Sequence, residues 1–154
     1  MLAETLNRRD FMRTTGLLAA AAILPWQLTG CGDGAEISTD WETRATELEG
    51  LTAIRTEINP GPWGEKVGGH LPTVEVASDK SSVTVRTNHG MSEEHYISTI
   101  YIRDQDGVVI GLQEFSPSDA EPVAMFTLPL GTTSVTAYSY CNLHDHWMTE
   151  AYTL

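Results

Sequence analysis

The chain has 154 residues, of which 9 are basic and 21 are acidic, giving a formal net charge of −12 at pH 7. This length predicts one domain of ordinary size. The acidic balance argues against nucleic acid or an anionic membrane surface as a partner, because both repel a negatively charged protein.

The first thirty residues have the pattern of an export signal. An arginine pair, Arg8 and Arg9, precedes a short apolar stretch at residues 16–25. That stretch is shorter than the roughly 20 residues that span a bilayer. A basic start followed by a short apolar run is typical of export signals. The arginine pair resembles the twin-arginine type, which carries proteins across the membrane already folded.

The segment Leu28-Thr29-Gly30-Cys31 resembles a bacterial lipobox. Such a signal is cut before the cysteine, and lipid chains attached to Cys31 would then anchor the protein. The alternative is a plain exported protein in which Cys31 is a free thiol. We therefore expect an exported protein, in the periplasm or on the outer face of the cytoplasmic membrane, that meets the membrane through its lipid anchor alone.

Three parts follow from this pattern: a signal at 1–30, an acidic tether at 31–50 and a domain at 51–154. Removing residues 1–30 leaves 6 basic and 19 acidic residues, so the net charge of the remainder is −13. If Cys31 is lipidated, Cys141 is the one thiol left. It is then an inert buried side chain, a free thiol or a metal ligand.

From about residue 71 the sequence predicts strands. Alternating or β-branched segments occur at 73–76, 82–86, 96–103, 108–112, 123–128, 134–140 and 148–153. Short strands at this spacing, with no convincing helix after the signal, predict an all-β antiparallel sandwich of about seven strands. Residues 59–70 are rich in glycine and proline and are expected to form a loop that serves as a site or a hinge.

All five histidines lie in the predicted sandwich: His70, His89, His95, His144 and His146. The first four and Cys141 fall at predicted strand ends, so one end of the sandwich could gather them. Imidazole and thiolate bind transition metals, and five ligands exceed the four of a structural zinc site. They indicate iron with an open sixth position for a small molecule. His146 is expected to be a neighbour on the solvent side.

Two segments resemble the signatures of the superoxide reductases, which include the neelaredoxin and desulfoferrodoxin proteins. They are His89-Gly90-Met91-Ser92-Glu93-Glu94-His95-Tyr96-Ile97 and Cys141-Asn142-Leu143-His144-Asp145-His146-Trp147. That family pairs His-Pro-Met, running into Glu-His-Tyr-Ile, with a terminal Cys-Asn-x-His-Gly-x-Trp. His70-Leu71-Pro72 resembles its third element, His-x-Pro. The resemblance spans about residues 59–154.

This resemblance implies a seven-stranded immunoglobulin-like sandwich and a mononuclear iron centre, Fe²⁺/Fe³⁺, of the one-iron type. It places His70, His89, His95 and His144 around the iron and Cys141 on its axis. The implied reaction reduces superoxide to hydrogen peroxide. Backbone N–H groups of residues 142 or 143 are expected to donate to the Cys141 sulfur and tune the centre.

The sequence departs from the family pattern beside two ligands. The family has a Glu-Lys pair directly before its first ligand region, whereas Gly68 and Gly69 precede His70 here. Glu65 and Lys66 lie slightly earlier, and we expect the glycines to let this loop fold back so that Lys66 attracts the anion. Asp145 replaces the family's glycine and is expected to disfavour an anionic substrate.

Two other classes stay open at this point. Cys141, His144, Met148 and His89 approximate a cupredoxin-like copper site for electron transfer. An iron-binding domain without enzymatic activity is the second alternative. Further expectations are a separate redox donor protein, attracted by the acidic surface, and a homo-oligomer like family members of similar size.

Overall fold

The computed structural model describes residues 39–154. The expected export signal, Cys31 and the first part of the tether lie outside these residues. Within the described part of the chain, no helix is long and apolar enough to cross a membrane.

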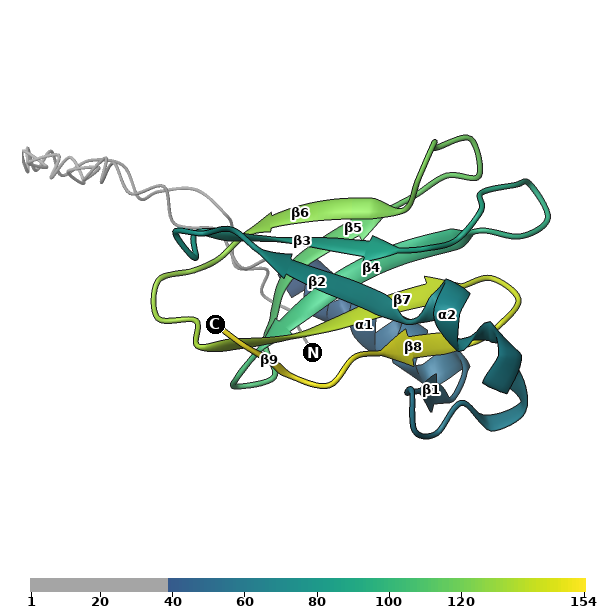
Figure 1. The fold of residues 1–154 in the computed structure, drawn as a ribbon, viewed down its shortest axis with the longest axis horizontal. Helices are drawn as coiled ribbons and strands as arrows, with labels where there is room; N and C mark the ends of the chain where they lie inside the picture. The colour runs from purple at the N-terminus through teal and green to yellow at the C-terminus, as the bar shows by residue number, and fades with distance from the viewer. Residues whose placement is uncertain (1–38) are drawn as a thin grey trace, which may run out of the picture. The chain divides into compact units, whose positions relative to one another are not determined.

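Two sheets pack face to face (Figure 1). The larger sheet has the order β1 (Ile54–Arg55), β8 (His146–Met148), β7 (Ser134–Cys141), β4 (Ile97–Asp104) and β5 (Val109–Glu114), and β9 (Tyr152–Thr153) also pairs with β7. The smaller sheet has the order β2 (Pro72–Val76), β3 (Ser82–Thr87) and β6 (Val123–Thr127). Apart from the parallel β1–β8 pair, the neighbouring strands are antiparallel. The predicted all-β sandwich is confirmed.

The main core lies between the two sheets. Alternate residues of a strand face the same side of its sheet, and the inward positions here carry branched apolar side chains. The buried set includes Val83, Val85, Ile100, Ile102, Ile110, Phe126, Val135 and Ala137. This core holds the ends of β3, β4 and β7 together, and three of the candidate ligands lie at or just beyond those ends.

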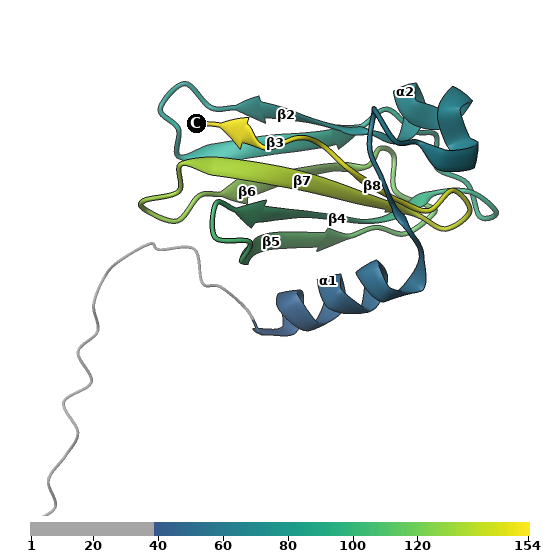
Figure 2. The same ribbon diagram turned by 90° about the horizontal axis from the view of Figure 1, so that it is seen from below.

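A helix covers the outer face of the larger sheet. Helix α1 (Thr39–Leu51) runs beside β5 (Figure 2). Ala45 and Leu48 are fully buried, and Ala45 packs with Tyr101 and Tyr138 of the sheet. The expectation of an acidic tether therefore does not hold for residues 39–50, and the prediction of no helix after the signal is wrong.

Charged contacts explain why an acidic segment docks as a helix. Arg103 of β4 forms ion pairs with Glu42 at 2.9 Å and with Glu49 at 3.0 Å. The Tyr101 hydroxyl donates to Glu49 at 2.7 Å. These contacts neutralise carboxylates that, in the sequence alone, indicate a solvated segment.

Replacing Leu48 by alanine is expected to lower the free energy of unfolding by about 2–5 kcal/mol, because it removes a buried side chain and leaves a cavity under α1. Urea denaturation measures this change. Leu51→Ala is the matched control, since Leu51 is 64% exposed, and it is expected to change stability by less than about 0.5 kcal/mol. If Leu48→Ala lowers the free energy of unfolding as little as the control does, the packing of α1 does not contribute to the stability of the fold.

Two further elements differ from the expected ones. The last predicted strand is divided into β8 and β9, which pair with opposite ends of β7. Between them, the Thr149 hydroxyl accepts from the backbone N–H of Ala137 at 3.1 Å. The loop at 59–70 contains a 3₁₀ helix, η1 (Gly61–Lys66), followed by one α-helical turn, α2 (Val67–His70). This helical turn sets the direction in which His70 points.

Candidate metal centre

His70 is the last residue of α2 and is buried. Its ring Nδ1 lies 3.0 Å from the Lys66 carbonyl, which places the N–H on Nδ1 and leaves Nε2 as the free lone pair. The Ser139 hydroxyl of β7 donates to the His70 carbonyl at 2.7 Å. Both contacts fix this histidine at the end of the sandwich with Nε2 facing the other candidate ligands.

His89 and His95 lie in the connection between β3 and β4. The Nδ1 of His89 is hydrogen-bonded to the Gly90 carbonyl, so its Nε2 is also free. Asn142 holds this connection from the other side. Its side-chain oxygen accepts from the Tyr96 N–H at 3.0 Å, and its side-chain nitrogen donates to the Glu94 carbonyl at 3.0 Å.

Cys141 and His144 belong to the tight turn between β7 and β8. The backbone N–H of Cys141 donates to the Asp145 carbonyl at 3.1 Å and closes the turn. The indole of the fully buried Trp147 donates to the His144 carbonyl at 2.7 Å. The turn is therefore fixed at both ends, with the cysteine buried and the histidine half-buried.

Five potential ligand atoms converge at this end of the sandwich. The ligand atoms of His70, His89, His95 and Cys141 lie within 4.8 Å of one another. The Nδ1 of His144 joins them at 3.0 Å from the Nε2 of His70 and 3.8 Å from the Cys141 sulfur. The structure thus brings together all five residues that the resemblance assigns as ligands.

The spacing of the nitrogens fits a metal ion. The Nε2 atoms of His89 and His95 are 2.9 Å apart, and the His70–His144 pair is at 3.0 Å. Two nitrogens bound at right angles, each at about 2.1 Å from a metal, are about 3.0 Å apart. The donor set of four imidazoles and one thiolate suits iron and disfavours a four-coordinate structural zinc site.

Burial lowers the pKa of His70 to about 4, with a smaller opposing effect from the Lys66 carbonyl. The ring is therefore neutral and able to bind a metal at pH 7. Burial raises the pKa of the Cys141 thiol, while backbone N–H groups of Leu143 and His144 lower it by hydrogen bonding to the sulfur. The thiolate of Cys141 thus needs both these donors and a nearby cation.

The two faces of the cluster differ in exposure. Cys141 and His70 are buried, whereas His89, His95 and His144 are half-buried. The thiolate therefore lies on the protein side, and the open side of the histidine group faces solvent. A small molecule can approach the group from that side.

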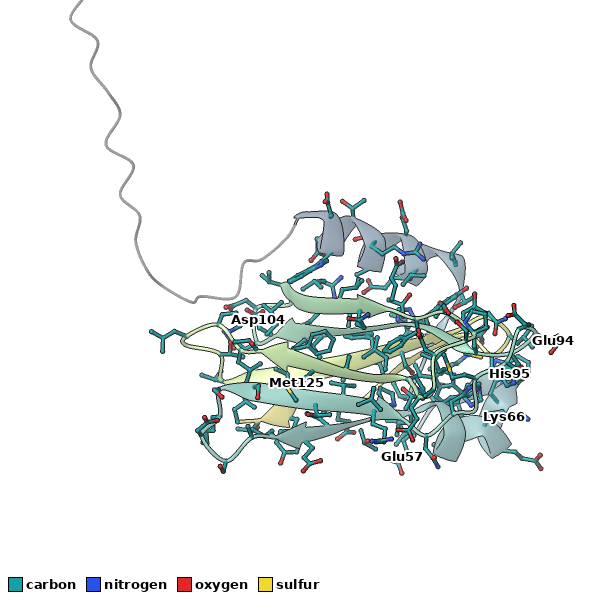
Figure 3. The ribbon with its side chains drawn as sticks, turned by 90° about the horizontal axis from the view of Figure 1, so that it is seen from above. Glu57, Lys66, Glu94, His95, Asp104 and Met125 are labelled. Atoms are coloured by element: carbon teal, nitrogen blue, oxygen red, sulfur yellow. The ribbon has the colours of Figure 1, made fainter. Side chains whose placement is uncertain are left out.

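Lys66 lies near this open side. Figure 3 shows its side chain at the same end of the molecule as His95. After burial, the positive charge of Lys66 is a further cause that lowers the pKa of His95, and it acts in the same direction on His144. Glu65, its neighbour, is exposed.

One expectation about the ligand turn is wrong. His146 is fully buried and not on the solvent side, and it packs among Tyr101, Tyr138 and Tyr140. The carboxylate of Asp145 is paired with Arg55 at 2.7 Å, and the expected effect of its charge on an anionic substrate stays a prediction.

The position of Met148 argues against a cupredoxin-like copper site. Met148 packs with Tyr101 and Tyr138 against the outer face of the larger sheet, away from the sulfur of Cys141. His70 and His95 would also have no function in a cupredoxin-like site, although their nitrogens converge with the others.

Sequence patterns did not assign the supporting residues. Asn142 belongs to the Cys-Asn-x-His segment that resembles the family pattern, but the sequence did not indicate that its side chain binds Tyr96 and Glu94. Ser139, Arg55 and Trp63 carry no motif. They are recognisable only once the chain has folded, because each contacts the ligand segments from a distant part of the sequence.

The desulfoferrodoxin family model matches residues 63–150. Desulfoferrodoxin of Nitratidesulfovibrio vulgaris is 39% identical over 84 residues, which are 53% of this chain and 62% of that protein. The chain thus matches less than two thirds of this relative's length. Superoxide reductase of Pyrococcus abyssi is 30% identical over 113 residues, covering 63% of this chain and 96% of that protein.

Among solved structures, a superoxide reductase (neelaredoxin) from Ignicoccus hospitalis is similar, with a TM-score of 0.54 and 30% sequence identity. The match covers 66% of this chain and 93% of that one. All five converging side chains lie within the residues that the family model matches, and those residues form more than half of the chain. On this basis, the chain belongs to the desulfoferrodoxin family.

Proposed function

We propose that the protein is a superoxide reductase with one mononuclear iron centre. The observation that carries this proposal is the convergence of four histidine nitrogens on the buried sulfur of Cys141. Iron held by these five residues would supply one electron to superoxide, in the balance O₂•⁻ + e⁻ + 2H⁺ → H₂O₂. A separate reductant must return the electron after each turnover.

The protein's own residues have distinct tasks in this reaction. The rings of His70 and His89 are held by backbone carbonyls, so that each presents Nε2. The thiolate of Cys141 supplies negative charge from the buried side, and the N–H groups of Leu143 and His144 limit its basicity. Superoxide enters and peroxide leaves on the solvent side, where water supplies the protons.

Lys66 is proposed to attract superoxide to the open side of the centre, with Glu65 beside it on the same short helix. Its charge already acts on two of the ligand histidines. Position and charge therefore support the role that the sequence suggested for this loop.

Replacing Lys66 by glutamine is expected to slow the reaction with superoxide about threefold at low salt, because one favourable charge is lost near the entry side. The difference from the wild type is expected to shrink as ionic strength rises. Pulse-generated superoxide with absorbance detection measures the rate. Lys80→Gln is the matched control, since Lys80 follows β2 at the end of the strand away from His70. An unchanged rate in the Lys66 variant would show that Lys66 does not attract superoxide to the centre.

Metal analysis and a superoxide assay of residues 32–154 test the function as a whole. About one iron per chain, with superoxide consumption that depends on an added reductant, is the expected result. Copper in place of iron would support the electron-carrier alternative. Bound iron without superoxide consumption would support the iron-binding domain without enzymatic activity.

We further propose that the chain is exported and anchored by lipid at Cys31, with a basic redox protein as its electron donor. The arginine pair, the short apolar stretch and the lipobox-like segment support export. The acidic surface supports a basic donor. Metabolic labelling with an alkyne fatty acid is expected to mark the wild type and not Cys31→Ser. Labelling of neither protein would contradict the anchor.

Sedimentation of the purified protein tests the expected homo-oligomer.

A further inference from the structure

Asp145 has a backbone conformation that normally favours glycine. Its φ is 65°, in the left-handed region that residues other than glycine, asparagine and aspartate rarely adopt. Aspartate tolerates this region at some energetic cost, which glycine would avoid. The side chain at this position is therefore expected to provide a compensating contact.

The contacts of Asp145 are concentrated on one carboxylate oxygen. Its Oδ2 accepts from Arg55 Nε at 2.9 Å and pairs with Arg55 Nη2 at 2.7 Å. The same oxygen accepts from the Trp63 indole at 3.0 Å. The side chains of Arg55 and Asp145 are each only 19% exposed, so salt screens this pair less than a surface pair. We call these three residues the Asp145 clamp.

The backbone at Gly61 leaves space for the guanidinium of Arg55. Gly61, with φ 58°, lies beside it, and a Cβ at Gly61 would collide with the guanidinium. Arg55 itself is fixed by the parallel pairing of β1 with β8, in which it is the register partner of Trp147. The clamp therefore joins β1, η1 and the ligand turn.

The clamp connects segments that carry ligands. Asp145 follows His144 directly, and the Trp63 and His144 rings pack in a T-shaped arrangement with centroids 4.8 Å apart. Trp63 lies in η1, which continues through Lys66 into α2 and His70. The contacts of Asp145 thus link the turn that carries His144 to the helical segment that carries His70.

We propose that Asp145 is a positioning residue that, through Arg55 and Trp63, holds the segment with Lys66 and His70 against the turn with Cys141 and His144. This inference rests on the metal centre proposed above and goes beyond it. The clamp makes the ligand geometry depend on a contact that none of the ligands makes.

The test is a Co²⁺ titration of the full chain, followed through the absorption of the bond between the Cys141 sulfur and the metal. Arg55→Met and Asp145→Gly are each expected to bind Co²⁺ at least about tenfold more weakly and to shift this absorption band, as contacts that orient ligands usually do. Arg86→Met is the matched control, because it removes an exposed ion pair with Glu121 on the other sheet. It is expected to match the wild type in both readouts.

Asp145→Gly separates positioning from folding. It relieves the backbone cost at φ 65° but also removes the contacts to Arg55 and Trp63. Because these two effects oppose each other, the midpoint of thermal unfolding of the metal-free protein is expected to stay about unchanged. Asp145→Asn keeps an acceptor for Trp63 without the charge for Arg55 and is expected to bind Co²⁺ with intermediate affinity.

Wild-type Co²⁺ affinity and an unshifted band in both Arg55→Met and Asp145→Gly would overturn the clamp alone. Absence of a band involving Cys141 in the wild type would overturn the metal centre and the clamp together. A loss of Co²⁺ affinity that only follows a loss of thermal stability would also overturn the positioning role.

Discussion

Replacing Cys141 by serine is expected to lower the rate of superoxide reduction by at least about 100-fold and to abolish the visible absorption of the iron–sulfur bond. Changes to residues that merely orient ligands cost 10- to 100-fold, and Cys141 is itself a ligand. A buried serine hydroxyl does not ionise near neutral pH, so the negative charge on the buried side of the centre is lost.

Stopped-flow mixing with superoxide and absorption spectroscopy measure both effects. Cys31→Ser is the matched control, because it changes the other cysteine and leaves the ligand set intact. Iron content is expected to fall less than the rate in Cys141→Ser, since four histidines remain. A variant that keeps the rate would show that the sulfur is not needed for the reaction.

Replacing His146 by phenylalanine is expected to stabilise the protein, and by more at low pH. His146 is fully buried among three tyrosines, and neither ring nitrogen has a hydrogen-bond partner among the described residues. A buried polar group without a partner costs about 1–3 kcal/mol. Phenylalanine keeps the aromatic contacts without that cost.

The pH dependence follows from the pKa of His146, which burial lowers to about 4 in the folded state. In the unfolded chain the ring gains its proton near pH 6.5. Stability from this group is therefore complete above pH 6.5 and is lost as pH falls toward 4. Between pH 7 and pH 5, the advantage of the phenylalanine variant is expected to grow by about 2 kcal/mol.

Urea denaturation of wild type and His146→Phe at pH 7 and pH 5, in the same metal state, gives this difference. The comparison cancels the titration of the ligand histidines, which both proteins share. A constant difference across this pH range would mean that His146 is not held neutral by the fold.

Local patterns predicted the strands well. Alternation in 73–76 and 82–86 corresponds to β2 and β3, and the aromatic and β-branched run at 96–103 corresponds to β4. These strands have one face in the main core, so their sequence records their burial directly. Helix α1 was not predictable in this way, because its acidic side chains are stabilised by Arg103 and Tyr101, far away in the sequence.

The sequence by itself determined the candidate metal ligands. Imidazole and thiolate are groups that bind transition metals, their positions at predicted strand ends placed them at one end of a sandwich, and the family resemblance selected the five. That information is local, since Cys141 and His144 share one turn and His89 and His95 share one loop.

Only the tertiary structure decided how the surroundings of the centre work. It buried His146, which the sequence placed in solvent, because three tyrosines of the larger sheet pack around its ring. It also paired Asp145 with Arg55. Burial and charge compensation arise between segments that are distant in the chain, so no local pattern contains them.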